Sequence, residues 1–148
     1  MWAIAIGLLV GAHVATPLRA AFAQSPKPET SIKELMETTI ADASNTLWAT
    51  SEAPQTDAGW RAVEVAAQAL VDAANIVARG GTGPMDEAWA KQSAWQAFNG
   101  VMLRASQQAL TAARTKNYNA LLAASDVLYP PCEGCHLQFN PGVTGAQN

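Results

Sequence analysis

Cysteine and histidine are scarce in this chain of 148 residues, which contains only two of each. A structural zinc site usually needs about four such ligands, so these counts argue against zinc. Basic residues are also few: no basic run exceeds two residues, and the formal net charge is −3. We therefore expect no nucleic-acid binding. No stretch shows the alternating pattern of a β-strand, so the sequence predicts an all-α protein and argues against a thioredoxin-like redox pair, which would lie near a strand and a helix.

Both cysteines belong to one motif near the end of the chain, Cys132-Glu133-Gly134-Cys135-His136. Cys-x-x-Cys-His is the local pattern that attaches a c-type haem covalently. Two thiols three positions apart can form thioethers with the two vinyl groups of one porphyrin, and the following imidazole can bind the iron. The sequence thus predicts one haem c held by Cys132 and Cys135, with His136 as the proximal iron ligand.

The first residues have the pattern of an export signal. Residues 2–18 are apolar and uncharged, and Ala21-Phe22-Ala23 has the small-x-small pattern that signal peptidase accepts. No lysine or arginine precedes the apolar run, and the alternative is an uncleaved membrane anchor at the lower limit of a spanning length. We expect a signal peptide over residues 1–23, a short linker over 24–30 and a single domain over 31–148, exported to the periplasm. His13 would be removed with the signal.

Four amphipathic helices are expected in the mature domain. Ser31 with Glu34 forms a capping-box pattern that starts the first helix, and Pro54 is expected to end it, because the residue before a proline is pushed out of the helical region. The second begins near Asp57 and stops at the glycines of residues 80–83. The third is expected over residues 86–115, and the fourth opens at Asn117. Helices of this length with short loops predict an antiparallel up-down-up-down bundle, with the haem near the C-terminal end of the fourth helix.

A Cys-x-x-Cys-His motif near the C-terminus of a chain with four helices resembles the class II c-type cytochromes, the cytochrome c prime group. The resemblance covers residues 30–139, and its specific parts are the motif, its terminal position and the helix order. Class I cytochromes differ, because they carry the motif near the N-terminus and a methionine ligand far downstream. The class II resemblance also implies a homodimer through the outer faces of the first two helices.

Members of this family either leave the sixth iron position open or fill it with a methionine of the first helix. Met36 matches the second pattern, and it lies about one and a half turns into the first helix, at the expected haem end. Met102 would be about 24 Å from that end at 1.5 Å per residue, and Met85 is expected in a loop. The resemblance therefore implies Met36 as the distal iron ligand, although a methionine on an apolar helix face can also be core packing.

The tryptophans are assigned by their expected position in the bundle. Trp89 and Trp95 belong to the haem-end half of the third helix and are expected to line the haem pocket or to pack in the core beside it. Trp48 and Trp60 are expected at the far end, as core or interface residues. Pro130-Pro131 departs from the family pattern, because prolines break a helix; we expect an interruption there, with Pro131 starting a new short helix.

The expected function is single-electron transfer between redox protein partners by an exported monohaem cytochrome. His/Met ligation raises the reduction potential of haem iron, which suits this task. The alternatives are a high-spin cytochrome that binds or senses gases, if Met36 is only packing, and a haem subunit of a larger oxidoreductase. Serine, histidine and acidic residues form no recognisable catalytic arrangement, so we do not expect an enzyme. Association with a membrane is expected only if the N-terminal segment stays uncleaved.

Overall fold

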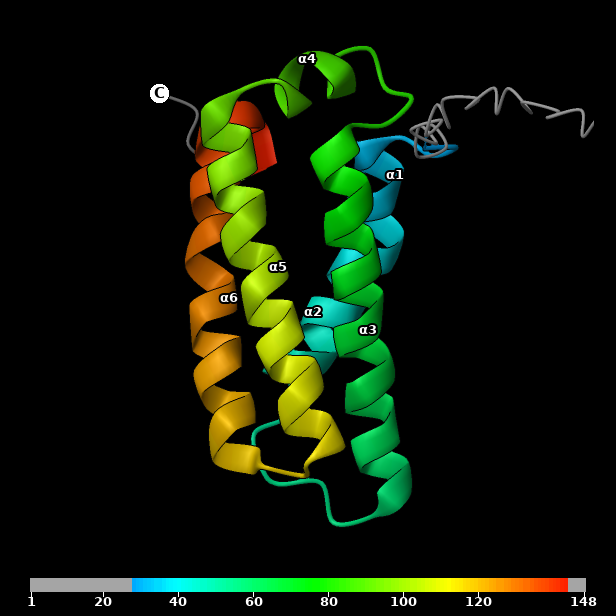
Figure 1. The fold of residues 1–148 in the computed structure, drawn as a ribbon, viewed down its shortest axis with the longest axis vertical. Coiled ribbons are helices and arrows are strands. Elements are labelled where there is room, and N and C mark those ends of the chain that lie inside the picture. Colours follow the sequence, from blue (N-terminus) through cyan, green and yellow to red (C-terminus); the bar gives the residue numbers. More distant parts are fainter. Residues whose placement is uncertain (1–27, 144–148) are drawn as a thin grey trace, which may run out of the picture.

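The computed structural model describes residues 28–143 and is all-helical over that range, with no β-strand. The expected signal peptide and most of the expected linker lie outside the described residues. Figure 1 shows the long helices side by side, with α4 crossing one end. The elements in chain order are α1 (Ile32–Leu35), η1 (Met36–Ile40), α2 (Ala41–Trp48), α3 (Asp57–Arg79), α4 (Asp86–Ala90), α5 (Ser93–Arg114), α6 (Tyr118–Phe139) and η2 (Pro141–Val143).

The first three elements follow one another without a break, and we call residues 32–48 the first helical segment. Its predicted start is confirmed: Ser31 is the N-cap, and its side-chain oxygen accepts a hydrogen bond from the Glu34 backbone N–H. The Glu34 carboxylate accepts from the Thr30 hydroxyl at 2.8 Å. The expectation that Pro54 ends the helix is wrong, because the segment already ends at Trp48, with Ala49 as its C-cap. Its middle part, η1, is a π-helix, which the sequence did not indicate.

α3 begins one residue away from the predicted cap. Thr56, not Asp57, is the N-cap, and its hydroxyl oxygen accepts from the Gly59 N–H at 3.1 Å. The helix ends where glycine was expected to stop it. Gly80 has φ +83°, a left-handed conformation that glycine adopts without the penalty of a Cβ atom.

The single helix predicted over residues 86–115 is wrong, because the chain breaks between α4 and α5. Gln92 is extended, with φ −85° and ψ 136°. The Gln96 side-chain amide donates to the carbonyl of Ala90 at 2.6 Å and to that of Ala78 at 2.9 Å. These bonds satisfy carbonyls that the helix ends leave without a partner, so the break is stabilised by a side chain outside the apolar pattern.

α6 begins as predicted and then continues where an interruption was expected. The Asn117 side chain caps it by accepting from the Ala120 N–H at 3.0 Å. Pro130 and Pro131 both lie inside the helix. Each removes one backbone donor, and the carbonyls that lose their partners belong to Asp126 and Val127, which are exposed. Water can therefore solvate these carbonyls, and the motif remains on the same helix.

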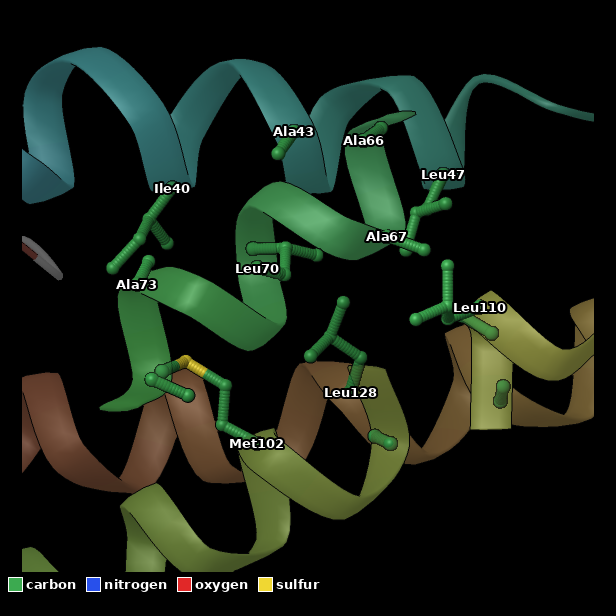
Figure 2. Close-up of a cluster of buried hydrophobic side chains, with 14 of the residues drawn as sticks. Ile40, Ala43, Leu47, Ala66, Ala67, Leu70, Ala73, Met102, Leu110 and Leu128 are labelled. Atoms are coloured by element: carbon green, nitrogen blue, oxygen red, sulfur yellow. The ribbon is translucent and has the colours of Figure 1, made fainter. Parts of the chain in front are cut away.

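The core lies between the first helical segment, α3, α5 and α6, whose side chains converge in Figure 2. α3 packs against α5, α5 against α6, and α2 against α3. Leu47, Leu70, Leu121 and Leu128 are almost fully buried. Ala67, Ala74, Ala105 and Ala109 are also inaccessible to solvent or nearly so, and such small residues let helix axes approach closely.

Several helix ends meet at one end of the molecule. The start of α1, the end of α3, α4 and the end of α6 all lie at that end in Figure 1. The first helical segment meets α6 through Trp48, whose indole N–H donates to the Ser125 carbonyl at 3.4 Å and whose ring lies 6.0 Å from that of Tyr129. Within residues 28–143, none of the helices is both long and apolar enough to span a membrane.

Candidate functional site

A cavity of about 230 Å³ lies between the first helical segment, α5 and α6. Its lining is mostly apolar and includes the motif side chains of α6 on one side and Met36 on another. The lining residues are Met36, Ile40, Ala41, Ser44, Asn45, Trp48, Val77, Trp95, Phe98, Asn99, Met102, Pro131, Cys132, Cys135 and His136. The structure thus brings together five of the six predicted site residues, and only Trp89 does not line this cavity.

The motif side chains share one face of α6 because of their spacing. Positions three and four apart are neighbours on a helix surface, so Cys132, Cys135 and His136 all reach the cavity. Each of the three residues is half-buried. The Cys132 thiol donates a hydrogen bond to the Leu128 carbonyl one turn earlier, at 3.3 Å. Both cysteines are free thiols and are therefore available for covalent attachment.

Burial controls the ionisation of these thiols. It raises the pKa of the Cys132 thiol above its ordinary value. For Cys135, burial together with the nearby Cys132 charge raises the pKa to about 11. A thiolate is the reactive nucleophile, so raised pKa values favour the protonated thiol at neutral pH. Their environment is unlike that of an activated catalytic cysteine.

Met36 reaches the cavity from the first helical segment, at the first residue of the π-helix. It is partly buried and packs against the core. A π-helix closes its hydrogen bonds five residues on rather than four, so one turn holds about one extra residue. This shifts Met36 around the helix relative to Ser44 and Trp48, and all three side chains line the same cavity.

Met102 lies closer to the site than its sequence position suggested. Because the predicted third helix is broken, α5 begins at Ser93, and Met102 is only about 14 Å along it at 1.5 Å per residue. Met102 lines the same cavity as Met36 and is buried. Our expectation that it is too far from the site is therefore wrong. Met85 is exposed and directly precedes α4.

The tryptophans divide differently from the prediction. Trp95 is buried, lines the cavity and donates its indole N–H to the Val77 carbonyl at 3.0 Å. Trp89 stacks on Trp95 with ring centroids 5.5 Å apart, so it supports the cavity wall from behind. Trp48, which was expected at the far end, also lines the cavity. Trp60 is buried in the core and so is not available for the expected dimer interface.

Phe98 and Gly134 form a contact that the sequence analysis missed. A Cβ atom at position 134 would lie 2.6 Å from Phe98 Cε1, which is closer than carbon atoms approach without repulsion. Glycine between the two cysteines therefore lets the aromatic ring pack directly against the α6 backbone. Phe98 also lines the cavity, so this contact fixes one part of its wall.

Asn99 is a second residue that the sequence analysis missed. It lines the cavity and is buried, and its side-chain N–H donates to the Ala74 carbonyl at 3.0 Å. Its Oδ1 is the one buried side-chain oxygen or nitrogen without a hydrogen-bond partner in the part of the chain that is described. A polar residue between Trp95 and Met102, on the apolar face of the helix, was the signal that could have identified it.

Comparisons with protein-family models, with curated proteins and with solved structures found no match to this chain.

Proposed function

We propose that this chain is a c-type haem protein in which Cys132 and Cys135 hold the haem and His136 binds its iron. The observation that carries the proposal is the cavity itself. The three side chains of a Cys-x-x-Cys-His motif line it together with Met36, which comes from a different part of the chain. Two thiols and an imidazole, with a thioether in the same apolar cavity, are the donor set that haem c uses.

The residues fit this cofactor chemically. Each thiol would add across one vinyl group: the S–C bond forms, the thiol proton passes to the other vinyl carbon, and no oxidant is needed. The mostly apolar lining would exclude water from the iron. Among the described residues, no three His, Cys, Asp or Glu side chains are grouped so as to hold a bare metal ion. A haem iron needs only axial ligands from the protein.

Within this class we propose a low-spin class II cytochrome. The first helical segment, α3, α4 with α5, and α6 would be the four helices of an antiparallel bundle. Met36 would be the distal ligand, and the bound haem would supply a one-electron iron couple. No substrate chemistry is required of the protein, so we propose an electron carrier rather than an enzyme, with redox proteins as partners.

The apolar wall around Met36 favours one alternative. Ile40, Ala41 and Met102 line the cavity with it, and none of these side chains donates a hydrogen bond. If Met36 is only a packing residue, this wall would admit a small diatomic gas, and a gas-binding cytochrome would be the better description. The state of Met36 separates the two functions.

Export to the periplasm is part of the proposal. It depends on the apolar residues 2–18 and on Ala21-Phe22-Ala23, and c-type haem is attached outside the cytoplasmic membrane. Mass spectrometry of the purified protein should then find an N-terminus at Gln24. Recovery of intact Met1 in the membrane fraction would contradict cleavage and would support the anchor.

The experiment that tests haem attachment is extraction with acidified acetone after expression with a cytochrome c maturation system. We expect the wild type to retain its haem, since thioethers survive this treatment. The double variant Cys132→Ala/Cys135→Ala should lose any haem that it binds. A matched control, Ser125→Ala on the same helix, should keep it. Complete extraction from the wild type would overturn the proposal.

A further inference from the structure

Asp86, at the start of α4, is a buried carboxylate that holds the beginning of the first helical segment. It is only 3% exposed. Its Oδ2 accepts a hydrogen bond from the Ile32 backbone N–H at 2.8 Å, across 54 positions of sequence, and another from the Gly83 N–H at 2.8 Å. The first N–H groups of a helix have no partner within the helix. Asp86 thus supplies an acceptor for α1 from a different part of the chain.

The loop before α4 is built closely around this carboxylate. A Cβ atom at Gly81 would lie 2.5 Å from Asp86 Oδ2, and one at Gly83 would lie 2.7 Å from both carboxylate oxygens. The Thr82 N–H donates to the Thr30 carbonyl at 3.1 Å, directly before the helix. The two glycines therefore allow the loop to approach both the carboxylate and the helix start.

The same short helix also reaches the end of α6. Trp89 of α4 lies 6.1 Å from the ring of Phe139, which is three residues beyond His136, and stacks on Trp95 of the cavity wall. The Trp95 and Phe139 rings are 5.1 Å apart. α4 therefore contacts the segment that carries Met36 at one side and the helix that carries His136 at the other.

We propose that Asp86 is a positioning residue that fixes Met36 relative to His136. It acts through the helix start: Ile32 is held by the carboxylate, and Met36 lies one turn further along the same segment. The part of this inference that concerns iron ligation depends on the proposed function. The part that concerns how stably the helical turn with Met36 is folded does not depend on it.

The test uses the full-length haem-loaded protein and carbon monoxide as the competing ligand. Asp86→Ala leaves the N–H groups of Ile32 and Gly83 without their acceptor, and hydrogen bonds to charged groups are the stronger ones. We expect ferrous Asp86→Ala to bind carbon monoxide at least about tenfold more tightly than the wild type, because Met36 detaches more readily. Asp86→Asn keeps one acceptor oxygen and should show a smaller shift, which also serves if Asp86→Ala does not fold.

The matched control is Thr56→Ala, which removes a helix cap at the opposite end of the molecule. It should lower the free energy of unfolding without changing the affinity for carbon monoxide. Equal shifts in Asp86→Ala and Thr56→Ala would mean that Asp86 contributes only general stability, and would overturn the inference.

Backbone amide hydrogen exchange gives a readout that needs no haem. Asp86→Ala should accelerate exchange in residues 35–41 by at least about tenfold, whereas Thr56→Ala should accelerate it only at the start of α3. A wild type without Met36 ligation would contradict the proposed function, yet this exchange result would still support the role of Asp86. Unchanged exchange in residues 35–41 would refute that role whether or not haem is bound.

Discussion

At the scale of single residues, the two thiols make the haem-free protein sensitive to alkaline pH. Burial and the neighbouring Cys132 raise the pKa of Cys135 from 9.0 in an ordinary environment to about 11. The folded state therefore retains a proton that the unfolded state loses above pH 9, so this contribution to stability is complete below about pH 9 and is lost as pH rises towards 11. The urea midpoint of the haem-free protein should fall across this range.

The control is Cys135→Ala, which should show a shallower fall over the same pH range. Haem-loaded protein should also lack this part of the pH dependence, because a thioether has no proton to lose. A wild-type midpoint with the same pH profile as that of Cys135→Ala would contradict the burial of this thiol.

We expect that position 134 requires glycine because Phe98 packs closely against it, and not because of its backbone conformation. Alanine in a helix interior is favoured over glycine by about 1 kcal/mol, but the new Cβ would lie 2.6 Å from the Phe98 ring. Overpacking costs about 1–3 kcal/mol, so Gly134→Ala should be neutral or destabilising. In a Phe98→Ala background the same change should stabilise by about 1 kcal/mol. Denaturant titrations of the wild type, Gly134→Ala, Phe98→Ala and the double variant measure how the effect of Gly134→Ala differs between the two backgrounds. The same effect in both backgrounds would contradict the contact.

At the scale of elements, the π-helix η1 should contain one residue more than the site requires. Thr38 is exposed within it, and its deletion should convert the turn to α-helix while leaving the segments on either side in place. We expect the variant to keep Met36 in the cavity. Its free energy of unfolding should stay within about 1 kcal/mol of the wild-type value, as is usual for changes at exposed positions. Amide exchange checks whether the turn becomes α-helix, and the haem spectrum checks whether Met36 stays in the cavity.

The spectrum of the deletion variant decides this prediction. If removing Thr38 abolishes methionine ligation, then the π-helix itself presents Met36 to the cavity, and the extra residue is needed rather than tolerated.

Local chemistry made some helix boundaries predictable and left others out of reach. Ser31 and Asn117 are caps whose side chains bond to N–H groups three residues later, so neighbouring residues suffice to identify them. The break before α5 depends on Gln96 reaching the carbonyl of Ala78 in another helix. The continuity of α6 through Pro130 depends on which carbonyls face water. Both are tertiary effects that a local pattern does not contain.

At the scale of the whole molecule, the expected helix order together with the resemblance to class II cytochromes placed Met36 and His136 near the same end, and both side chains line one cavity. Helix order determines which ends meet, and both residues were expected near the same end. It could not be predicted that Met102 also lines this cavity, because its distance along the helix depends on the break in the predicted third helix. The role of Asp86 was also missed, since its partner Ile32 is 54 positions away.

The measurement that tests the central claim most directly is the optical spectrum of the purified haem-loaded protein. We expect narrow low-spin bands in the ferrous form and the weak long-wavelength band of sulfur-to-iron ligation in the ferric form. Met36→Ala should abolish both and open the iron to carbon monoxide, whereas Met102→Leu, in the same cavity, should keep them. A wild type that is already high-spin and binds carbon monoxide freely, or a loss of these bands in Met102→Leu alone, would contradict the assignment of Met36 as the distal ligand.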